Sequence, residues 1–342
     1  MNLRNGSWLI TVSVLDTDIL DDRGDVLPFS RLAELWPLEG WRDVVRVPAG
    51  KNEHLRLTTG EGVFYLRRSY RSKSLDELTP QLLLMRLLRM RGLPVPVPMS
   101  STEGLQWAEV EGRLWVVTRA LPGSPYDDGS AAHLRGLGRM LARYHATVAD
   151  LQGASAEPRP LAELRERLIN LESDDPLRER AERVVDELTL LSPDLPRLIV
   201  HGGARRGSLL FDEDEVVGLL DLDSAHPDVR VLDLAVAVHD VGKVYTSFGA
   251  EDHQVNLDLD RVAGLLSAYC EVGTLSMSEA AALPLLIEAK RLKRALARLG
   301  RLREGEPLSV NDHAKVELER NRLVWLDNHR LDLELICATR AR

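Results

Sequence analysis

Apolar and polar residues alternate along much of the first third of the chain, and they follow a helical spacing along most of the remainder. Alternating runs bounded by turn residues predict strands, because successive side chains of a strand point to opposite faces of a sheet. The predicted strands are Val45–Val47, His54–Leu57, Val63–Arg67, Leu105–Val110 and Arg113–Arg119. Short glycine-containing turns join the second strand to the third and the fourth to the fifth, which predicts antiparallel hairpins.

Helical patterns occupy the rest of the chain. A wide apolar face over Asp76–Met90 predicts a helix that stops at Gly92 and Pro94. From residue 130 onward the apolar spacing is helical almost throughout. The predicted helices there are Leu134–His145, Leu161–Leu171, Ala181–Leu191, Leu232–Val241, Leu257–Cys270, Ser278–Arg303 and Val310–Leu335. The order of elements predicts an α+β protein with a sheet-rich first part and a helical second part.

We expect three segments on this basis. Residues 1–40 form a lead-in with one strand in Trp8–Leu15 and one helix in Phe29–Leu38. Residues 41–122 form the sheet-rich part, and residues 123–342 form the helical part, which carries a hairpin at 198–223. The boundary follows Leu121-Pro122-Gly123, since this triplet interrupts both kinds of pattern.

The hairpin region holds the most informative residues. Residues 199–211 read Ile-Val-His-Gly-Gly-Ala-Arg-Arg-Gly-Ser-Leu-Leu-Phe, and Gly-Leu-Leu-Asp-Leu-Asp follows at 218–223. This sequence resembles the active-site loop of the aminoglycoside phosphotransferase and choline kinase superfamily, particularly the type II homoserine kinases. The family pattern is His-x-Asp, four residues, then Asn; here His201 is kept, Gly203 stands at the Asp position and Ser208 at the Asn position.

Other segments extend the resemblance over about residues 40–330. They are Gly50-Lys51-Asn52-Glu53, Phe64-Tyr65-Leu66-Arg67-Arg68, Gly92-Leu93-Pro94-Val95-Pro96, the segment 137–145 and Leu232-Asp233-Leu234-Ala235. The resemblance implies a protein-kinase-like fold of two lobes, with a small antiparallel-sheet N-lobe, a large helical C-lobe and a ligand-binding cleft between them.

The resemblance also assigns roles to single residues. Asp221 takes the position of the principal metal-binding acid, and Ser208 that of the second metal ligand. Gly203 takes the position of the catalytic base without supplying a carboxylate, and His201 anchors the loop. For the N-lobe, the resemblance implies nucleotide contacts from Asn52 and Arg67, with Gln81 replacing the glutamate that usually pairs with the basic residue.

Two main interpretations of function follow, with a cleft repurposed for non-phosphoryl chemistry as a third and more remote one. The first is a catalytically impaired, pseudokinase-like protein that binds a nucleotide, a small molecule, a peptide or a partner enzyme. The alternative is an active but atypical phosphotransferase that uses Mg²⁺ and ATP or GTP to phosphorylate a hydroxyl or amine of a small metabolite or peptide. Phosphoryl transfer depends mostly on positioning and charge neutralisation, and loss of a general base costs about 10²–10⁴-fold in rate.

Nearby residues offer substitutes for the missing carboxylate. Asp223, His226 and Asp228 follow Asp221 closely, and each is either a replacement base or metal ligand or a residue of a solvated turn. We expect Asp233 to hold either His201 or Arg230.

Three further features have a candidate function, and for the first two a solvated surface is the other interpretation. Arg205 and Arg206 either bind a phosphate or an acidic partner or are simply solvated. Six cations flank an apolar seam in Ser278–Arg303, as a nucleic-acid or leader-peptide surface or as a solvated face; the second is favoured. They are Lys290, Arg291, Lys293, Arg294, Arg298 and Arg301. Tyr126, Asp127 and Asp128 are acceptor-site candidates by position alone.

Composition narrows the remaining choices. The net charge of −9 argues against nucleic acid as a partner, and 44% hydrophobic with 28% charged residues is typical of a soluble globular protein. The run Trp8–Leu15 is too short to span a membrane and no targeting segment is evident, so we expect a cytoplasmic location and no membrane partner. Cys270 and Cys337 are expected to be reduced thiols, with a disulfide as the alternative.

Overall fold

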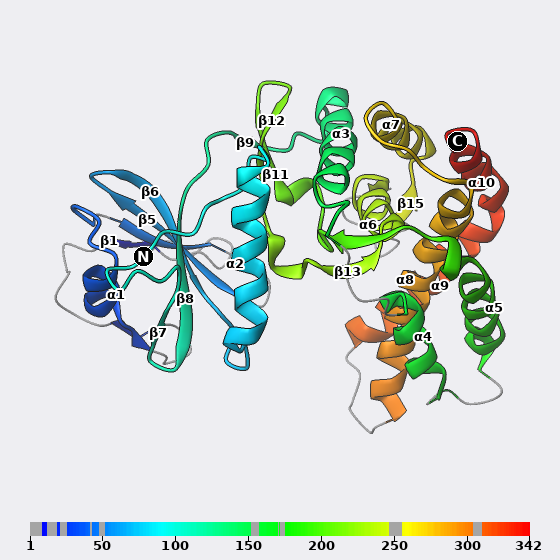
Figure 1. Ribbon diagram of the computed structural model, residues 1–342. Coiled ribbons are helices and arrows are strands. Elements are labelled where there is room, and N and C mark those ends of the chain that lie inside the picture. Colours follow the sequence, from blue (N-terminus) through cyan, green and yellow to red (C-terminus); the bar gives the residue numbers. More distant parts are fainter. Residues whose placement is uncertain are drawn as a thin grey trace. The chain divides into compact units, whose positions relative to one another are not determined.

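The computed structural model describes residues 9–11, 19–20, 26–41, 43–47, 52–151, 157–169, 171, 175–245, 255–303 and 310–342. The chain divides into two compact units (Figure 1). The first unit contains Met1–Gly123 together with Val217–Leu220, and the second contains Ser124–Val216 and Asp221–Arg342.

The first unit is built on a six-stranded sheet in the order β1-β4-β5-β6-β8-β7, in which every neighbouring pair is antiparallel. Its strands are β1 (Leu9–Thr11), β4 (Asp43–Val47), β5 (Glu53–Thr59), β6 (Gly62–Arg68), β7 (Ala108–Val110) and β8 (Arg113–Arg119). The two predicted hairpins are confirmed, because β5 pairs with β6 and β7 pairs with β8. The alternation of the sequence places Leu55, Leu57, Phe64 and Leu66 in the buried core of this unit.

The lead-in contains more strand than the sequence predicts. A two-residue pair, β2 (Ile19–Leu20) with β3 (Val26–Leu27), precedes helix α1 (Phe29–Leu35). Only Leu9–Thr11 of the predicted strand Trp8–Leu15 lies among the described residues. Helix α1 ends at Leu35 rather than at Leu38, because Trp36 precedes Pro37 and the residue before a proline disfavours helical geometry.

Helix α2 (Leu75–Met90) begins at a capping box that the sequence encodes in Ser74 and Glu77. The Glu77 backbone N–H donates to Ser74 Oγ at 3.2 Å, and the Ser74 backbone N–H donates to Glu77 Oε2 at 2.9 Å. Each side chain thus satisfies a backbone donor that the helix leaves unpaired, which fixes where α2 starts.

The second unit is mostly helical. Its helices are α3 (Ala131–Thr147), α4 (Arg159–Ile169), α5 (Pro176–Leu191), α6 (Val231–Val241), α7 (Leu259–Cys270), α8 (Met277–Arg303), α9 (Val310–Asn328) and α10 (Arg330–Ala338). The long helix α8 packs against α4, α5, α6, α9 and α10. Figure 1 shows α8 in orange among these helices. The single helix expected over Val310–Leu335 is wrong: α9 ends at Asn328, and α10 begins at Arg330.

Short strands flank the informative loop, and all of them belong to the second unit except the last three residues of β12, which belong to the first. Strand β10 (Arg197–Val200) pairs with β13 (His226–Val229), while β9 (Ser124–Pro125), β11 (Leu209–Asp212) and β12 (Glu215–Leu219) form a sheet in the order β12-β11-β9. The loop expected to be one hairpin over 198–223 therefore connects two sheets, since β10 pairs with β13 and not with β11. Strands β14 (Lys243–Tyr245) and β15 (Val255–Leu257) form a separate antiparallel pair.

The α+β class and the contrast between a sheet-rich unit and a helical unit are confirmed. Cys270 and Cys337 are both free thiols, as expected. Within the described part of the chain, no helix is both long enough and apolar enough to cross a membrane.

Candidate functional site

The loop that begins at His201 is held by a buried carboxylate. Asp233, in the first turn of α6, is fully buried and accepts the backbone N–H groups of His201 at 2.7 Å and Gly202 at 2.8 Å. His145 Nε2 lies 3.1 Å from Asp233 Oδ2, and His145 Nδ1 lies 2.9 Å from the Tyr269 hydroxyl. Of the two residues expected to contact Asp233, His201 is confirmed, while Arg230 pairs with Glu279 instead.

These contacts keep Asp233 ionised. Burial raises the pKa of a carboxyl group, but the His145 hydrogen bond, the charges of His145 and His201 and the His201 backbone N–H hold the pKa of Asp233 below its usual value. A buried charge with this many donors fixes the backbone that supplies them. Asp233 therefore sets the geometry of the start of the loop.

Gly202 and Gly203 differ in the space around them. Gly202 has φ +72°, and a Cβ there would lie 2.3 Å from the Ser224 carbonyl oxygen, so only glycine fits. A Cβ on Gly203 would meet ordinary contacts, at 3.6 Å from Asp221 Oδ2 and 3.8 Å from His201 Nδ1. The position where the family has its aspartate thus admits a side chain that would point toward Asp221.

His201 and Ser208 brace the loop from within. The His201 ring is fully buried, and its Nδ1 accepts the Gly203 backbone N–H at 3.3 Å. Ser208, at the end of the 3₁₀ turn η2 (Arg206–Ser208), is also buried, and its Oγ donates to the Gly203 carbonyl at 2.8 Å. The backbone of Gly203 is therefore fixed on both sides, although it carries no side chain.

Asp221 is exposed and adopts a left-handed backbone conformation, with φ 62° and ψ 50°. Such a conformation is costly for a residue other than glycine and is concentrated at functional sites. Asp223 follows within the 3₁₀ turn η3 (Leu222–Ser224) and is half-buried. Asp221 therefore combines an exposed carboxylate with a backbone conformation that disfavours most residues.

His226 and Asp228 have structural contacts. His226 Nδ1 lies 2.7 Å from the Ser224 carbonyl oxygen and Nε2 lies 3.2 Å from Asp228 Oδ2, so both ring nitrogens face acceptors. The hydrogen bond to Asp228 raises the pKa of His226, with burial acting in the opposite direction. Asp228 is buried and also accepts the backbone N–H groups of Arg159 and Val229. These two residues hold the turn after Asp221.

A second polar group surrounds Arg206. Its guanidinium contacts both carboxylate oxygens of Asp128 at 2.6 Å, and its Nε lies 3.2 Å from Asp240 Oδ2. Arg261 donates to the Asp128 backbone carbonyl at 2.8 Å and lies 3.4 Å from the Tyr126 hydroxyl. Two of the positional candidates, Tyr126 and Asp128, thus belong to one charged network with Arg206. Sequence analysis missed Asp240 and Arg261, which lie on separate helical segments and carry no motif.

The first unit holds the remaining predicted site residues. Arg67, on β6, is buried and lies opposite His54 of β5. Asn52 is also buried, and its Oδ1 accepts the Tyr70 backbone N–H at 3.2 Å. Gln81 lies half-buried on α2. Gly50 and Lys51, which precede Asn52 in the segment that matches the family, lie outside the described residues.

Asp221 and Ser208 are the residues that the resemblance assigns to metal binding. Among the described residues, no group of three or more His, Cys, Asp or Glu side chains is arranged to hold a metal ion. Magnesium in phosphoryl-transfer sites is commonly bound through one or two carboxylates together with substrate phosphates. The exposed carboxylate of Asp221 fits that kind of site, in which the nucleotide supplies most ligands.

The antiparallel sheet, the helical unit and the buried anchor of the 201–208 loop are together the features of a protein-kinase-like fold. A family model described as "Phosphotransferase enzyme family" matches residues 44–271. The chain belongs to this family.

Relatives and solved structures agree with this assignment. The chain is 30% identical to the homoserine kinase of Methylobacillus glycogenes, with 84% of this chain and 87% of that protein covered. It is 27% identical to the homoserine kinase of Methylobacillus flagellatus, with 87% and 94% covered. Among solved structures, the amicoumacin kinase hAmiN, in complex with AMP-PNP, Ca²⁺ and Ami, has a TM-score of 0.66 and 17% identity, covering 85% of this chain and 90% of that one. The predicted protein-kinase-like fold and superfamily are confirmed.

Proposed function

We propose that the protein is an active, atypical phosphotransferase that transfers the terminal phosphoryl group of ATP to a hydroxyl or amine of a small metabolite. The observation that carries this proposal is the similarity to two homoserine kinases over more than four fifths of the chain. Homoserine is therefore the first acceptor to test. The alternative interpretation of the sequence is better supported than the pseudokinase-like one.

The loop geometry is consistent with turnover. The phosphoryl group passes through a loose transition state, so catalysis depends on alignment and charge more than on proton abstraction. The anchors of the loop, Asp233, His201 and Ser208, are all in place. The missing carboxylate at Gly203 removes a contribution of about 10²–10⁴-fold, which leaves a slow enzyme rather than an inert one.

Asp221 would hold the metal ion. Magnesium, when bound, neutralises the phosphate charge of the nucleotide. ATP is the proposed phosphoryl donor, with GTP as the other nucleotide to test. An acceptor hydroxyl in the space beside Gly203 would lie close to Asp221 Oδ2, which is 3.6 Å from the Cβ position of that residue. Asp221 then orients the acceptor. The proton of the acceptor hydroxyl leaves to water or to the transferred phosphoryl group.

A second candidate function is binding without turnover, as in a pseudokinase that senses a nucleotide or docks on a partner enzyme. Gly203 favours it, because the family's base is absent there. Ser208 favours it too, because its hydroxyl is buried and already donates to the Gly203 carbonyl.

One set of measurements separates the two functions. Calorimetric titration with magnesium–ATP and magnesium–GTP measures binding, and ³¹P spectroscopy of the protein with magnesium–ATP and L-homoserine measures transfer. Gly203→Asp, alone and with Ser208→Asn, is expected to raise the transfer rate at least tenfold, because a side chain fits at 203.

Gly207→Asp is the matched control. Gly207 lies in the same loop, is exposed, and has no neighbouring atom within 4 Å of its Cβ position, so an added carboxylate there leaves the rate unchanged. Nucleotide binding without transfer to L-homoserine in any of these variants would favour the second function. Absence of nucleotide binding would exclude the phosphotransferase and the nucleotide sensor, and would leave docking on a partner enzyme.

A further inference from the structure

Five cations gather near the middle of α8 in the second unit. Lys290, Arg291 and Arg294 lie on α8, Lys243 lies on β14, and Arg205 lies on the loop between His201 and Ser208. Contacts with α6 bring these elements together: Asp240 accepts the backbone N–H of Arg206, the neighbour of Arg205, at 3.0 Å and lies 3.9 Å from Lys243. The adjacent His239 lies 3.0 Å from Arg294. The charges of the other four cations also act on the Lys290 ammonium. We call these five residues the cation cluster. It lies in a protein whose net charge is −9, so the local charge opposes the global one.

Few carboxylates balance this charge. Glu319 lies 3.5 Å from Arg291 and 4.0 Å from Arg294, but it also pairs with Arg322 at 2.7 Å. Asp240 lies 3.9 Å from Lys243 and accepts from Arg206 at 3.0 and 3.2 Å.

Two members of the cluster have no carboxylate of their own. Within the described ranges, neither Lys290 nor Arg205 forms an ion pair. Lys290 is half-buried on α8 and Arg205 is exposed on the loop, so the unbalanced charge reaches from the helix to the surface.

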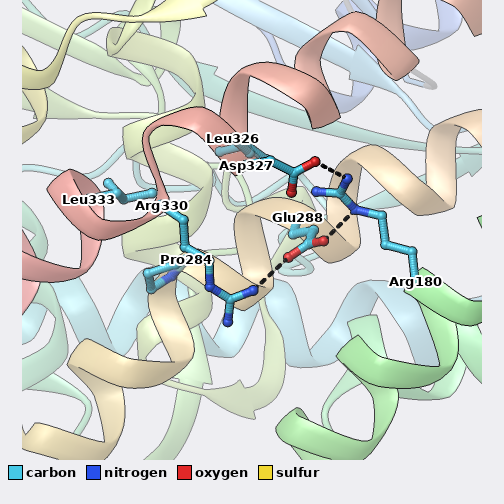
Figure 2. A pocket seen from close by; sticks show the side chains of 7 residues that line it. All are labelled: Arg180, Pro284, Glu288, Leu326, Asp327, Arg330 and Leu333. Carbon is cyan, nitrogen blue, oxygen red and sulfur yellow. Dashed lines mark hydrogen bonds and ion pairs between the residues drawn. The ribbon is translucent and has the colours of Figure 1, made fainter.

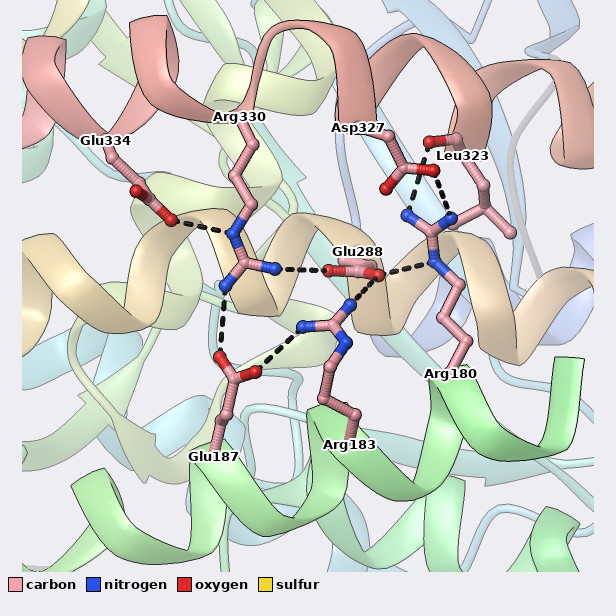
Figure 3. A network of polar contacts seen from close by, with 8 residues as sticks. All are labelled: Arg180, Arg183, Glu187, Glu288, Leu323, Asp327, Arg330 and Glu334. Atoms are coloured by element: carbon pink, nitrogen blue, oxygen red, sulfur yellow. Dashed lines mark hydrogen bonds and ion pairs between the residues drawn. The ribbon is translucent and has the colours of Figure 1, made fainter.

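The same helix shows how this protein balances buried charge elsewhere. Glu288, two residues before Lys290, contacts Arg180 at 2.5 Å, Arg183 at 2.6 Å and Arg330 at 3.8 Å. Figure 3 shows these arginines paired further with acids of α5, α9 and α10, namely Glu187, Asp327 and Glu334. Figure 2 shows that the small pocket beside this network is lined by the paired groups and by Pro284, Leu326 and Leu333. That region is a structural clamp, since each charge is matched.

The sequence favoured a solvated basic face on α8, and the structure shows that part of this face is buried. Arg291 is buried, and burial together with the surrounding cations lowers the pKa of Lys290 to about 7. His239, on α6, is buried as well, and its Nε2 lies 3.0 Å from Arg294 Nη1, so it must accept from the guanidinium. Its Nδ1 is buried with no hydrogen-bond partner in the described structure. Cationic donors that are buried or half-buried without matching acceptors are costly unless an anion balances them.

We propose that the cation cluster binds an oxyanion, the carboxylate or phosphate group of the acceptor molecule. Arg205 joins the cluster to the loop that begins at His201, so an anion bound to Arg205 and Lys290 would place the rest of the acceptor beside that loop. The identification of the anion as part of the acceptor rests on the proposed function. The existence of the anion site does not.

Sulfate is the first probe, because it does not titrate near neutral pH. Calorimetry on the full chain without nucleotide is expected to show sulfate binding, with proton uptake at pH 7 seen as a dependence of the heat on the buffer. Proton uptake follows because the bound anion stabilises the charged form of Lys290. It offsets the repulsion from the neighbouring cations, which are Arg205, Lys243, Arg291 and Arg294. Asp240 and His239 also lie near the cluster. Acetate is expected to compete with sulfate if a carboxylate fits.

Lys290→Gln and Arg205→Gln are expected to weaken sulfate binding at least tenfold, and Lys290→Gln to abolish the proton uptake. Lys293→Gln is the matched control, because Lys293 lies on the same helix but pairs with Glu163 at 2.5 Å. Unfolding curves establish that each variant is folded.

Three results would overturn the proposal. The first is no sulfate binding by the unaltered protein, and the second is equal binding by the Lys290 and Lys293 variants. The third is loss of sulfate binding when magnesium–ATP is bound, which assigns the anion to the nucleotide rather than to the acceptor. Failure of phosphoryl transfer with sulfate binding intact would reject the proposed function alone.

Discussion

Asp233 accepts the His201 backbone N–H at 2.7 Å, and this hydrogen bond joins the first turn of α6 to the start of the catalytic-type loop. The contact spans 32 residues of sequence and depends on the side chain of one partner and the main chain of the other. The side chain of His201 is thereby left to accept from Gly203. The anchor is intact although the aspartate two residues after His201 is missing.

Asp233→Asn is expected to destabilise the fold by about 2–4 kcal/mol, because an amide cannot accept three donors and would turn its own N–H toward one of them. Urea unfolding followed by circular dichroism measures the change. Asp212→Asn, at the exposed end of β11, is the control and is expected to stay within about 0.5 kcal/mol. Equal stability of the two variants would show that Asp233 does not hold the loop.

Adjacent glycines of the loop should respond in opposite directions to alanine. Gly202→Ala places a Cβ 2.3 Å from the Ser224 carbonyl oxygen and is expected to cost at least about 2 kcal/mol. Gly203→Ala meets no contact below 3.6 Å and is expected to stabilise by about 0.4–1 kcal/mol through the unfolded chain. The two unfolding free energies, measured side by side, test the space assigned to the missing base. A loss at Gly203 as large as that at Gly202 contradicts the assignment.

Substitutions of Asp221 should change both the stability of the protein and its magnesium-dependent nucleotide binding. Asp221→Gly relieves the left-handed backbone and is expected to be about 1 kcal/mol more stable than Asp221→Ala. Both variants are expected to lose magnesium-dependent nucleotide binding, measured by calorimetry with and without the metal. Asp223→Ala serves as the comparison and retains that binding. Unchanged nucleotide affinity in the Asp221 variants would remove this residue from the metal site.

The pair formed by His226 and Asp228 should make stability depend on pH. Because the pKa of His226 is raised in the folded protein, its contribution is full below the unfolded value of about 6.5 and is lost as the pH rises through the folded value. We expect the free energy of unfolding of the unaltered protein to exceed that of the His226→Gln variant by about 1 kcal/mol near pH 6. The difference should vanish toward about pH 9. Unfolding curves for the two proteins that stay parallel across this range would rule out a charged His226.

Local patterns predicted most of the fold. The stop at Gly92 and Pro94 and the alternation in β5 and β6 each act within a few residues, so sequence alone reveals them. The capping box of Ser74 and Glu77 is an equally local signal that the prediction did not use, and the prediction placed the start of α2 at Asp76, one residue late. The start of α5 at Pro176, behind the N-cap Asp175, had the same kind of signal, yet the prediction began at Ala181. That signal was available and was missed.

Long-range contacts were beyond the reach of pattern reasoning. Strand β9 is two residues long and exists because it pairs with β11, which lies more than eighty residues further on. The break between α9 and α10 falls at His329 without a glycine or proline to mark it. In the site, the spacing from His201 identified Gly203 and Ser208, but nothing in the sequence indicated that Asp240 and Arg261 would join Arg206 and Asp128.

The assignment of Val217–Leu220 to the first unit has a consequence for how the protein can be divided. Leu219 donates its backbone N–H to the Pro94 carbonyl at 2.7 Å, so a fragment cut after Gly123 loses a main-chain partner that is encoded almost a hundred codons downstream. Neither unit is therefore a cassette that recombination or subcloning can transfer with a single junction. Any chimaera built to exchange acceptor preference must carry the 217–220 segment with the sheet-rich unit. Asp221, the next residue, must stay with the helical unit.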